Sequence, residues 1–71
     1  MRVEDAFRMN LNREMIRQDI RPRTLAKRAG VSLTAVYEAK RGNCMPSTVT
    51  VWKLANGLGV LVDDLLKGAT E

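Results

Sequence analysis

The sequence contains no histidine and only one cysteine, Cys44. A zinc site built from the usual cysteine and histidine ligands is excluded, as is a histidine general base. A lone cysteine forms no disulfide within the chain, which is typical of a reducing compartment. We interpret Cys44 as an ordinary loop residue in preference to a redox switch. Because glycine-rich phosphate loops and paired carboxylates are also missing, we expect no metal, no cofactor and no enzymatic activity.

Aromatic residues make up only 4% of the chain, so aliphatic side chains and alanine must fill the core. No apolar run approaches the ~20 residues of a membrane span. The first ten residues carry acidic and polar side chains where a signal peptide needs an unbroken apolar stretch. We therefore expect a soluble, cytoplasmic protein with neither a membrane nor a small-molecule substrate as partner. Its 71 residues suffice for one domain, residues 1–71.

Positive charge prevails in the sequence, with 12 lysines and arginines against 8 acidic residues and a net charge of +4. Such a balance favours a polyanionic partner, although modest basicity is also common on solvated surfaces.

Apolar residues recur at helical spacing in five segments. The expected helices cover about Val3 to Gln18, Pro22 to Ala29, Leu33 to Arg41, a stretch that begins after Ser47 and is stopped by Gly57 and Gly59, and Val62 to Lys67. These segments predict a compact all-α domain.

The third expected helix has two different faces. Small apolar residues share one side, namely Ala35, Val36 and Ala39. Larger and polar residues share the other, namely Leu33, Thr34, Tyr37, Glu38 and Arg41. Before this helix, Gly30 suits a left-handed turn residue and Ser32 suits an N-cap. The pattern predicts a short turn that presents a polar helix face to an anionic partner.

The stretch LAKRAGVSLTAVYEAKRG, followed by PSTVTVWKLANGLGVLVDDLL, resembles the lambda-repressor-like helix-turn-helix family of phage repressors and Cro proteins. The resemblance covers about Leu11 to Leu66 and depends on the order and spacing of many weak elements. It implies a five-helix lambda-repressor-like domain whose second and third helices form a helix-turn-helix. It also implies a phage or prophage transcription regulator, a repressor that binds double-stranded DNA sequence-specifically as a homodimer on a two-fold operator.

The resemblance also implies roles for individual residues. The base-reading candidates are Ser32, Leu33, Thr34, Tyr37 and Glu38. By position, the phosphate-contact candidates are Arg21, Arg41 and Asn43. Lys27 and Lys40 are further candidates because they are basic. Alternatives remain for several of them. Glu38 can instead pair with Arg41 on the helix surface, Leu33 can pack on the turn, and each cation can simply be solvated.

The sequence departs from the family at three places. Pro22 stands where many members have a glutamine that touches the DNA backbone. Met15 and Lys40 replace an arginine and glutamate pair between the first and third helices. Leu61 stands where a polar cap usually begins the last helix, which leaves an apolar side chain exposed.

That exposed side chain suggests a partner surface in the C-terminal half of the chain. The dimer-interface candidates are Trp52, Leu61, Leu65 and Leu66. The alternative is that the leucines close the core of a monomer, that Leu61 is a tolerated surface residue and that Trp52 belongs to the core. The alternative function is an antitoxin-type protein-interaction module of the same fold, although few residues follow the last helix to hold such a partner.

Overall fold

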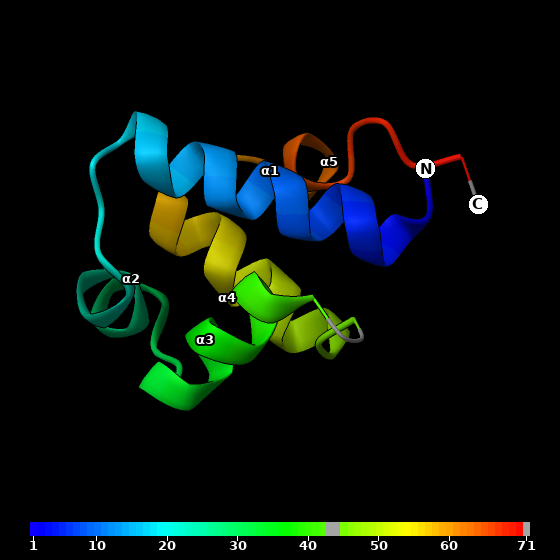
Figure 1. The fold of residues 1–71 in the computed structure, drawn as a ribbon. Coiled ribbons are helices and arrows are strands. Elements are labelled where there is room, and N and C mark those ends of the chain that lie inside the picture. Colours follow the sequence, from blue (N-terminus) through cyan, green and yellow to red (C-terminus); the bar gives the residue numbers. More distant parts are fainter. Residues whose placement is uncertain (43–44, 71) are drawn as a thin grey trace.

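The computed structural model describes residues 1–42 and 45–70, and this part of the chain forms five helices and no strand (Figure 1). The helices are α1 (Val3–Arg17), α2 (Pro22–Ala29), α3 (Leu33–Arg41), α4 (Thr48–Leu58) and α5 (Val62–Leu65). The all-α prediction is confirmed. None of these helices is long and apolar enough to cross a membrane.

The expected helix bounds hold closely, with two corrections. Helix α5 ends at Leu65 instead of Lys67, because Leu66 has a φ of −107° and leaves the helical conformation. Gly57 does not stop α4, which continues through it to Leu58 and ends at Gly59. Side-chain caps explain two of the starts, since Ser32 Oγ accepts from Ala35 N at 3.0 Å and Ser47 Oγ accepts from Thr50 N at 3.2 Å.

The core lies among the five helices, with α2 packed on α4 and α1 packed on α3 and α5. Its largest fully buried side chains come from all five, namely Phe7, Leu11, Leu25, Val36, Leu54 and Leu65. Of the stripe expected on α1, Phe7, Leu11 and Met15 are buried, whereas Val3 is half-buried. The chain packs with a radius of gyration of 10.6 Å, close to the ~11 Å typical of a folded chain of this length.

Gly57 marks the closest approach between α4 and α2. A Cβ atom built there would lie 2.9 Å from Ala29 Cβ, 3.0 Å from Ala29 N and 3.0 Å from Leu25 Cδ1. No larger residue fits without moving α2 away from α4. The helix contains glycine at this position because of a neighbour, and not because the helix ends there.

Two amide side chains of α1 and that of Gln18, the C-cap residue of α1, donate hydrogen bonds to the C-terminal ends of other helices. Asn10 Nδ2 donates to the carbonyls of Leu65 and Lys67 at 3.0 and 2.9 Å. Asn12 Nδ2 donates to Lys40 O at 3.3 Å, and Gln18 Nε2 donates to Leu58 O at 2.7 Å.

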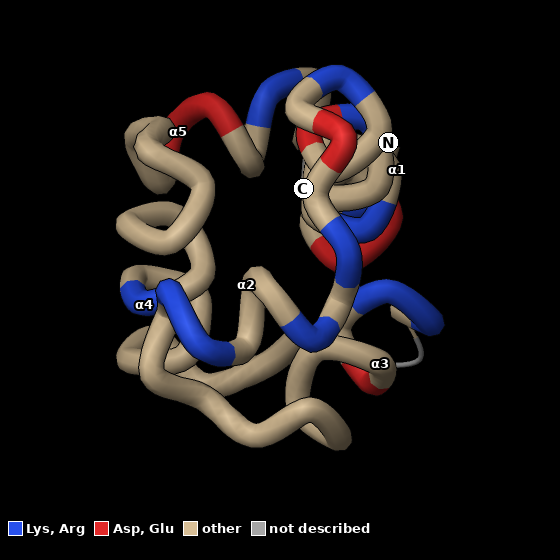
Figure 2. The backbone as a smooth tube through the Cα atoms, turned by 90° about the vertical axis from the view of Figure 1, so that its left-hand side faces the viewer, with Lys and Arg blue, Asp and Glu red and all other residues tan. Residues whose placement is uncertain are grey.

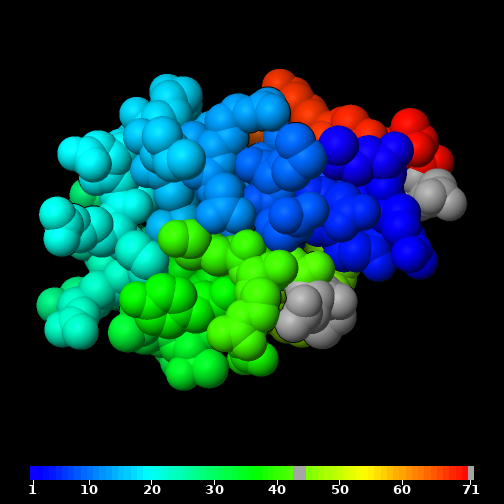
Figure 3. Space-filling view, in the orientation of Figure 1, coloured from blue at the N-terminus to red at the C-terminus, as the bar shows by residue number. Residues whose placement is uncertain are grey.

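The last carbonyls of a helix have no partner within it. The amides on α1 therefore satisfy acceptors at the ends of α3, α4 and α5, and fix where these helices end relative to α1. Figure 3 shows α1 and α3 in contact along one face of the molecule.

Helix α5 begins without a polar side chain at its N-cap, as the sequence indicates. Its N-terminus is stabilised from the other direction, because Asp64 Oδ2 accepts a hydrogen bond from Leu61 N at 3.0 Å. This is one half of a capping box, and it allows the apolar Leu61 to occupy the cap position.

Candidate nucleic-acid interface

Helices α2 and α3 are joined by a turn of three residues. Gly30 has a φ of +72°, a conformation that glycine adopts without strain. The N–H groups of Gly30 and Val31 both donate to Ala26 O, at 2.9 and 3.1 Å. Val31 is half-buried against the core, and Ser32 then caps α3. The turn is thus closed by local hydrogen bonds, and α3 is held at a fixed angle to α2 (Figure 1).

The two faces of α3 separate as the sequence predicts. Val36 and Ala39 are buried. The exposed positions follow one helical stripe, and they are Thr34, Tyr37, Glu38 and Arg41. Leu33 and Ala35 are half-buried at the borders of this stripe. The N-cap Ser32 is also exposed, but its oxygen already accepts the Ala35 N–H and serves the helix start.

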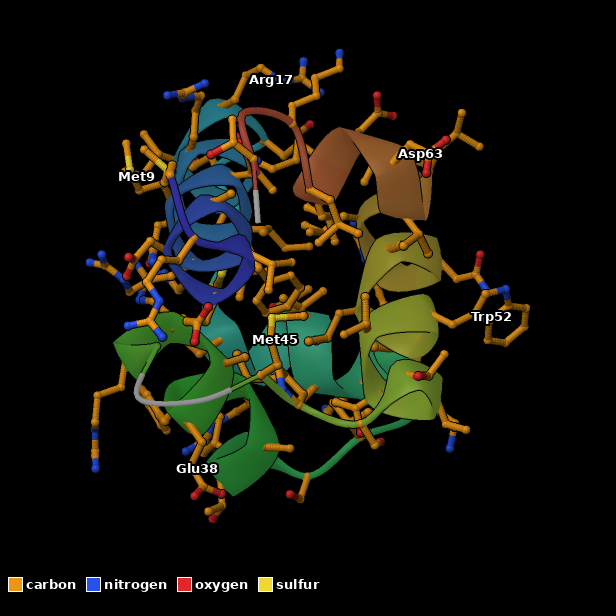
Figure 4. The ribbon with its side chains drawn as sticks, turned by 90° about the vertical axis from the view of Figure 1, so that its right-hand side faces the viewer. Met9, Arg17, Glu38, Met45, Trp52 and Asp63 are labelled. Carbon is orange, nitrogen blue, oxygen red and sulfur yellow. The ribbon has the colours of Figure 1, made fainter. Side chains whose placement is uncertain are left out.

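The side chains of the exposed stripe make no hydrogen bond and no ion pair within the described residues. The surface pair of Glu38 with Arg41 is therefore not formed, because the ion pairs there are Arg8–Asp5, Arg17–Glu14 and Lys67–Asp64. Glu38 points away from the body of the domain (Figure 4). Its carboxylate is free to accept a hydrogen bond from a partner.

Positive charge is concentrated in the segment that contains α2 and α3. Residues 21–41 contain six basic residues and one acidic residue, a net charge of +5. The remaining sequence contains six basic and seven acidic residues, a net charge of −1. Figure 2 shows basic positions along α2 and at the end of α3, whereas α1 carries both basic and acidic positions and α5 carries acidic ones. The segment that contains α2 and α3 is therefore the part of the chain that most favours an anionic partner.

The structure brings three of the phosphate-contact candidates to exposed positions around α2 and α3. Arg21 precedes α2, Lys27 lies in its last turn, and Arg41 ends α3.

Lys40 is separated from them. It is half-buried and lines a shallow groove with Asn12, Met15 and Ile16 of α1, on another side of α3 from the exposed stripe. Asn43 and Cys44 lie outside the described residues.

An open groove extends the α3 surface to the start of α4. It has a volume of about 280 Å³ and is lined by Ala35, Glu38, Ala39, Arg41, Pro46, Ser47 and Thr50. Sequence reasoning missed this neighbourhood, although Ser47 was recognisable as an N-cap. Free N–H groups at a helix N-terminus favour an anion. The beginning of α4 therefore adds to the electrostatic character of the same surface.

A cluster of charged and amide side chains lies elsewhere, at the C-terminal end of α1. Hydrogen bonds from Arg17 and, to a smaller extent, from Gln18 lower the pKa of the Glu14 carboxyl. The same contact with Glu14 raises the pKa of Arg17. Because Gln18 also caps α4, this cluster stabilises helix packing and takes no part in the α2–α3 surface.

The candidates for a dimer interface divide into exposed and buried residues. Trp52 and Leu61 are 58% and 70% exposed, and Trp52 projects away from α4 (Figure 4). Leu66 is half-buried and packs against the core. The prediction that Leu65 lies in the interface is wrong, because this side chain is 1% exposed and belongs to the core. Val49, at 60% exposure on α4, is an exposed apolar residue that the sequence reasoning missed.

The comparisons with known proteins identify no relative. No protein-family model, no curated protein and no solved structure matches the chain. Within the described residues there is also no group of three or more histidine, cysteine, aspartate or glutamate residues that could hold a metal ion.

Proposed function

We propose that this chain is a sequence-specific DNA-binding transcription regulator in which α2 and α3 act as a helix-turn-helix. Helix α3 enters the major groove with its N-terminal residues at the base edges, and α2 lies across the backbone. Arg21, Lys27 and Arg41 contact phosphates. The expected outcome is repression, because a domain bound at a promoter blocks access to it.

One observation carries the proposal. The net charge of +5 belongs to residues 21–41, which comprise α2, α3 and Arg21 before them, and the exposed side chains of α3 are not used by the fold. Thr34, Tyr37, Glu38 and Arg41 neither fill the core nor cap a helix. A helical hairpin that served only for packing would explain Leu25 and Val36, but not a polar stripe in the most basic part of the chain. Duplex DNA matches both the charge and the width of a single helix.

A homodimer on a two-fold site fits the size of the domain. Its longest extent is 31 Å, and half-sites one helical turn apart are separated by about 34 Å. The exposed apolar side chains of Val49, Trp52 and Leu61 are the candidates for the contact between subunits. Such a contact is small, so the dimer is expected to be weak in solution and reinforced on DNA.

An antitoxin-type interaction module is the second candidate, and the same apolar residues favour it. A protein partner of another kind would cover Val49, Trp52 and Leu61 as well as a second copy does. Purification of the chain together with a second protein, which remains bound in stoichiometric amount, would support this function. A pure chain that selects a palindromic DNA site would support the regulator.

The test of the regulator is in vitro selection from random duplex DNA, followed by titration of the selected site at several salt concentrations. Three phosphate contacts per subunit in a dimer predict a slope of log affinity against log salt of about −5. A palindromic selected motif would indicate two-fold binding. Failure to enrich any sequence, together with affinity independent of salt, would contradict the proposal.

A further inference from the structure

The exposed stripe of α3 is unusual in the residue types it lacks. Neither asparagine nor glutamine occurs between Leu33 and Arg41, and the only cations are Lys40 and Arg41 at its end. Lys40 lies against α1, and Arg41 is the last residue of the helix. In the major groove, guanine is usually read by arginine or lysine, and adenine by asparagine or glutamine. The first two turns of α3 therefore offer none of the side chains that read purines through two hydrogen bonds, and the Thr34 hydroxyl can contact either kind of base.

The side chains that are present match pyrimidines. A carboxylate accepts a hydrogen bond from the N4 amino group of cytosine, and Glu38 offers a carboxylate with no ion-pair partner in the described chain. The C5-methyl group of thymine is recognised by apolar contact. Leu33, Thr34 and Ala35 present methyl groups at the beginning of the helix, two of them at the borders of the stripe.

Glu38 also opposes binding to the wrong sequence. Its negative charge lies in the region of net charge +5 that would approach the phosphates. Against a base that offers no donor, this carboxylate loses water and gains only repulsion from the DNA. Discrimination by such a penalty is as effective as discrimination by a favourable contact. A cytosine whose N4 amino group donates a hydrogen bond to Glu38 would explain a carboxylate at this position.

We infer that α3 is a pyrimidine reader, in which Glu38 selects a cytosine through N4 and the methyl groups of Leu33, Thr34 and Ala35 select thymines through C5. The inference depends on the proposed DNA-binding function and adds the class of base that the site recognises. It predicts that the strand facing the start of α3 carries cytosine and thymine at the contacted positions.

The first experiment compares the sequences selected by the wild type, Glu38→Gln and Asp63→Asn. Glutamine reads adenine through N6 and N7. Glu38→Gln should therefore change one cytosine position per half-site to adenine and leave the others as they are. The preference for the new base should be roughly 5- to 140-fold. Asp63 is an exposed acid on the opposite side of the domain (Figure 4), so Asp63→Asn should select the wild-type sequence.

The second experiment replaces each thymine of the selected site by deoxyuridine, which removes only the C5-methyl group. One buried methyl group should account for about a fourfold loss of affinity at each contacted thymine. If the wild type selects a sequence but Glu38→Gln selects the same one and deoxyuridine changes nothing, the pyrimidine reader is wrong and DNA binding stands. If the wild type selects no sequence at all, the proposed function itself is wrong.

Discussion

Replacing Gly57 by alanine tests the packing that holds the α2–α3 unit on the rest of the domain. Alanine is the better helix former by about 1 kcal/mol, so propensity alone predicts a stabilising substitution. The added methyl group would lie 2.9 Å from Ala29 Cβ and 3.0 Å from Ala29 N. Carbon atoms in favourable contact are about 3.5–4.0 Å apart.

The neighbours decide the sign of the effect. Ala29 has no side-chain torsion with which to move its Cβ, and its N atom belongs to the backbone, so only a shift of α2 relieves the contact. Overpacking of this kind typically costs about 1–3 kcal/mol. After subtraction of the propensity gain, we expect Gly57→Ala to lower the free energy of unfolding by about 1 kcal/mol. For a domain of this size, the midpoint of thermal unfolding should fall by about 4–8 °C.

Thermal and urea unfolding followed by far-ultraviolet circular dichroism would measure this effect. Asn56→Ala is the matched control, because Asn56 is exposed on the same helix. Its replacement by alanine should raise the free energy of unfolding by a few tenths of a kcal/mol. Combining Gly57→Ala with Ala29→Gly should recover part of the loss, a coupling expected only of residues in contact. If Gly57→Ala stabilises the domain as Asn56→Ala does, α4 and α2 do not approach as closely as described here.

Three further substitutions test the dimer and the side chains of Asn10 and Gln18 that cap other helices. Asn10→Ala removes two hydrogen bonds and should cost about 1–2 kcal/mol in urea unfolding, whereas Arg13→Ala on the exposed side of α1 should change stability by less than about 0.5 kcal/mol. Equal effects of both would refute the capping role. Gln18→Glu places a second carboxylate beside Glu14 and a helix-end carbonyl, so its folded-state pKa should be raised. A group whose pKa is raised in the folded state contributes stability at low pH, and this contribution is lost as pH rises. The free energy of unfolding of the variant should therefore fall furthest below that of the wild type at neutral pH, and the difference should shrink toward about pH 4. A difference that does not depend on pH would contradict this. Leu61→Glu should abolish any dimer that small-angle scattering detects in the wild type at high concentration and weaken binding to a two-fold site. A monomeric wild type, together with unchanged binding by Leu61→Glu, would rule out this interface.

Local sequence determined the elements of the fold. The helix from Leu33 to Arg41 was predicted with its observed bounds, because Ser32 caps it through Ala35 three residues away and its two faces follow from the helical repeat. The turn at Gly30 was equally readable, since its hydrogen bonds return to Ala26. Such features depend on residues within one helical turn of each other, and so the sequence alone specifies them.

Tertiary structure decided which side chains of one helix contact or cap another helix. Asn10 bonds to carbonyls 55 and 57 residues away, and Gln18 to one 40 residues away. Polar residues at these positions look like ordinary solvated surface until the packing brings helix ends over them. The sequence predicts that Gly57 ends its helix, whereas the structure shows that glycine is needed there because Ala29 of another helix lies too close for a side chain.

The same division applies to the candidate sites. The sequence alone nominated Thr34, Glu38 and Arg41 as one exposed face, because a single helix contains all three. It predicted that Leu61 is exposed, as its 70% exposure shows, but it could not decide whether Leu65 faces a partner or the core, because both are apolar residues of one short segment. Which of them is buried depends on where α1 crosses α5, and that crossing is set by the packing of the whole domain.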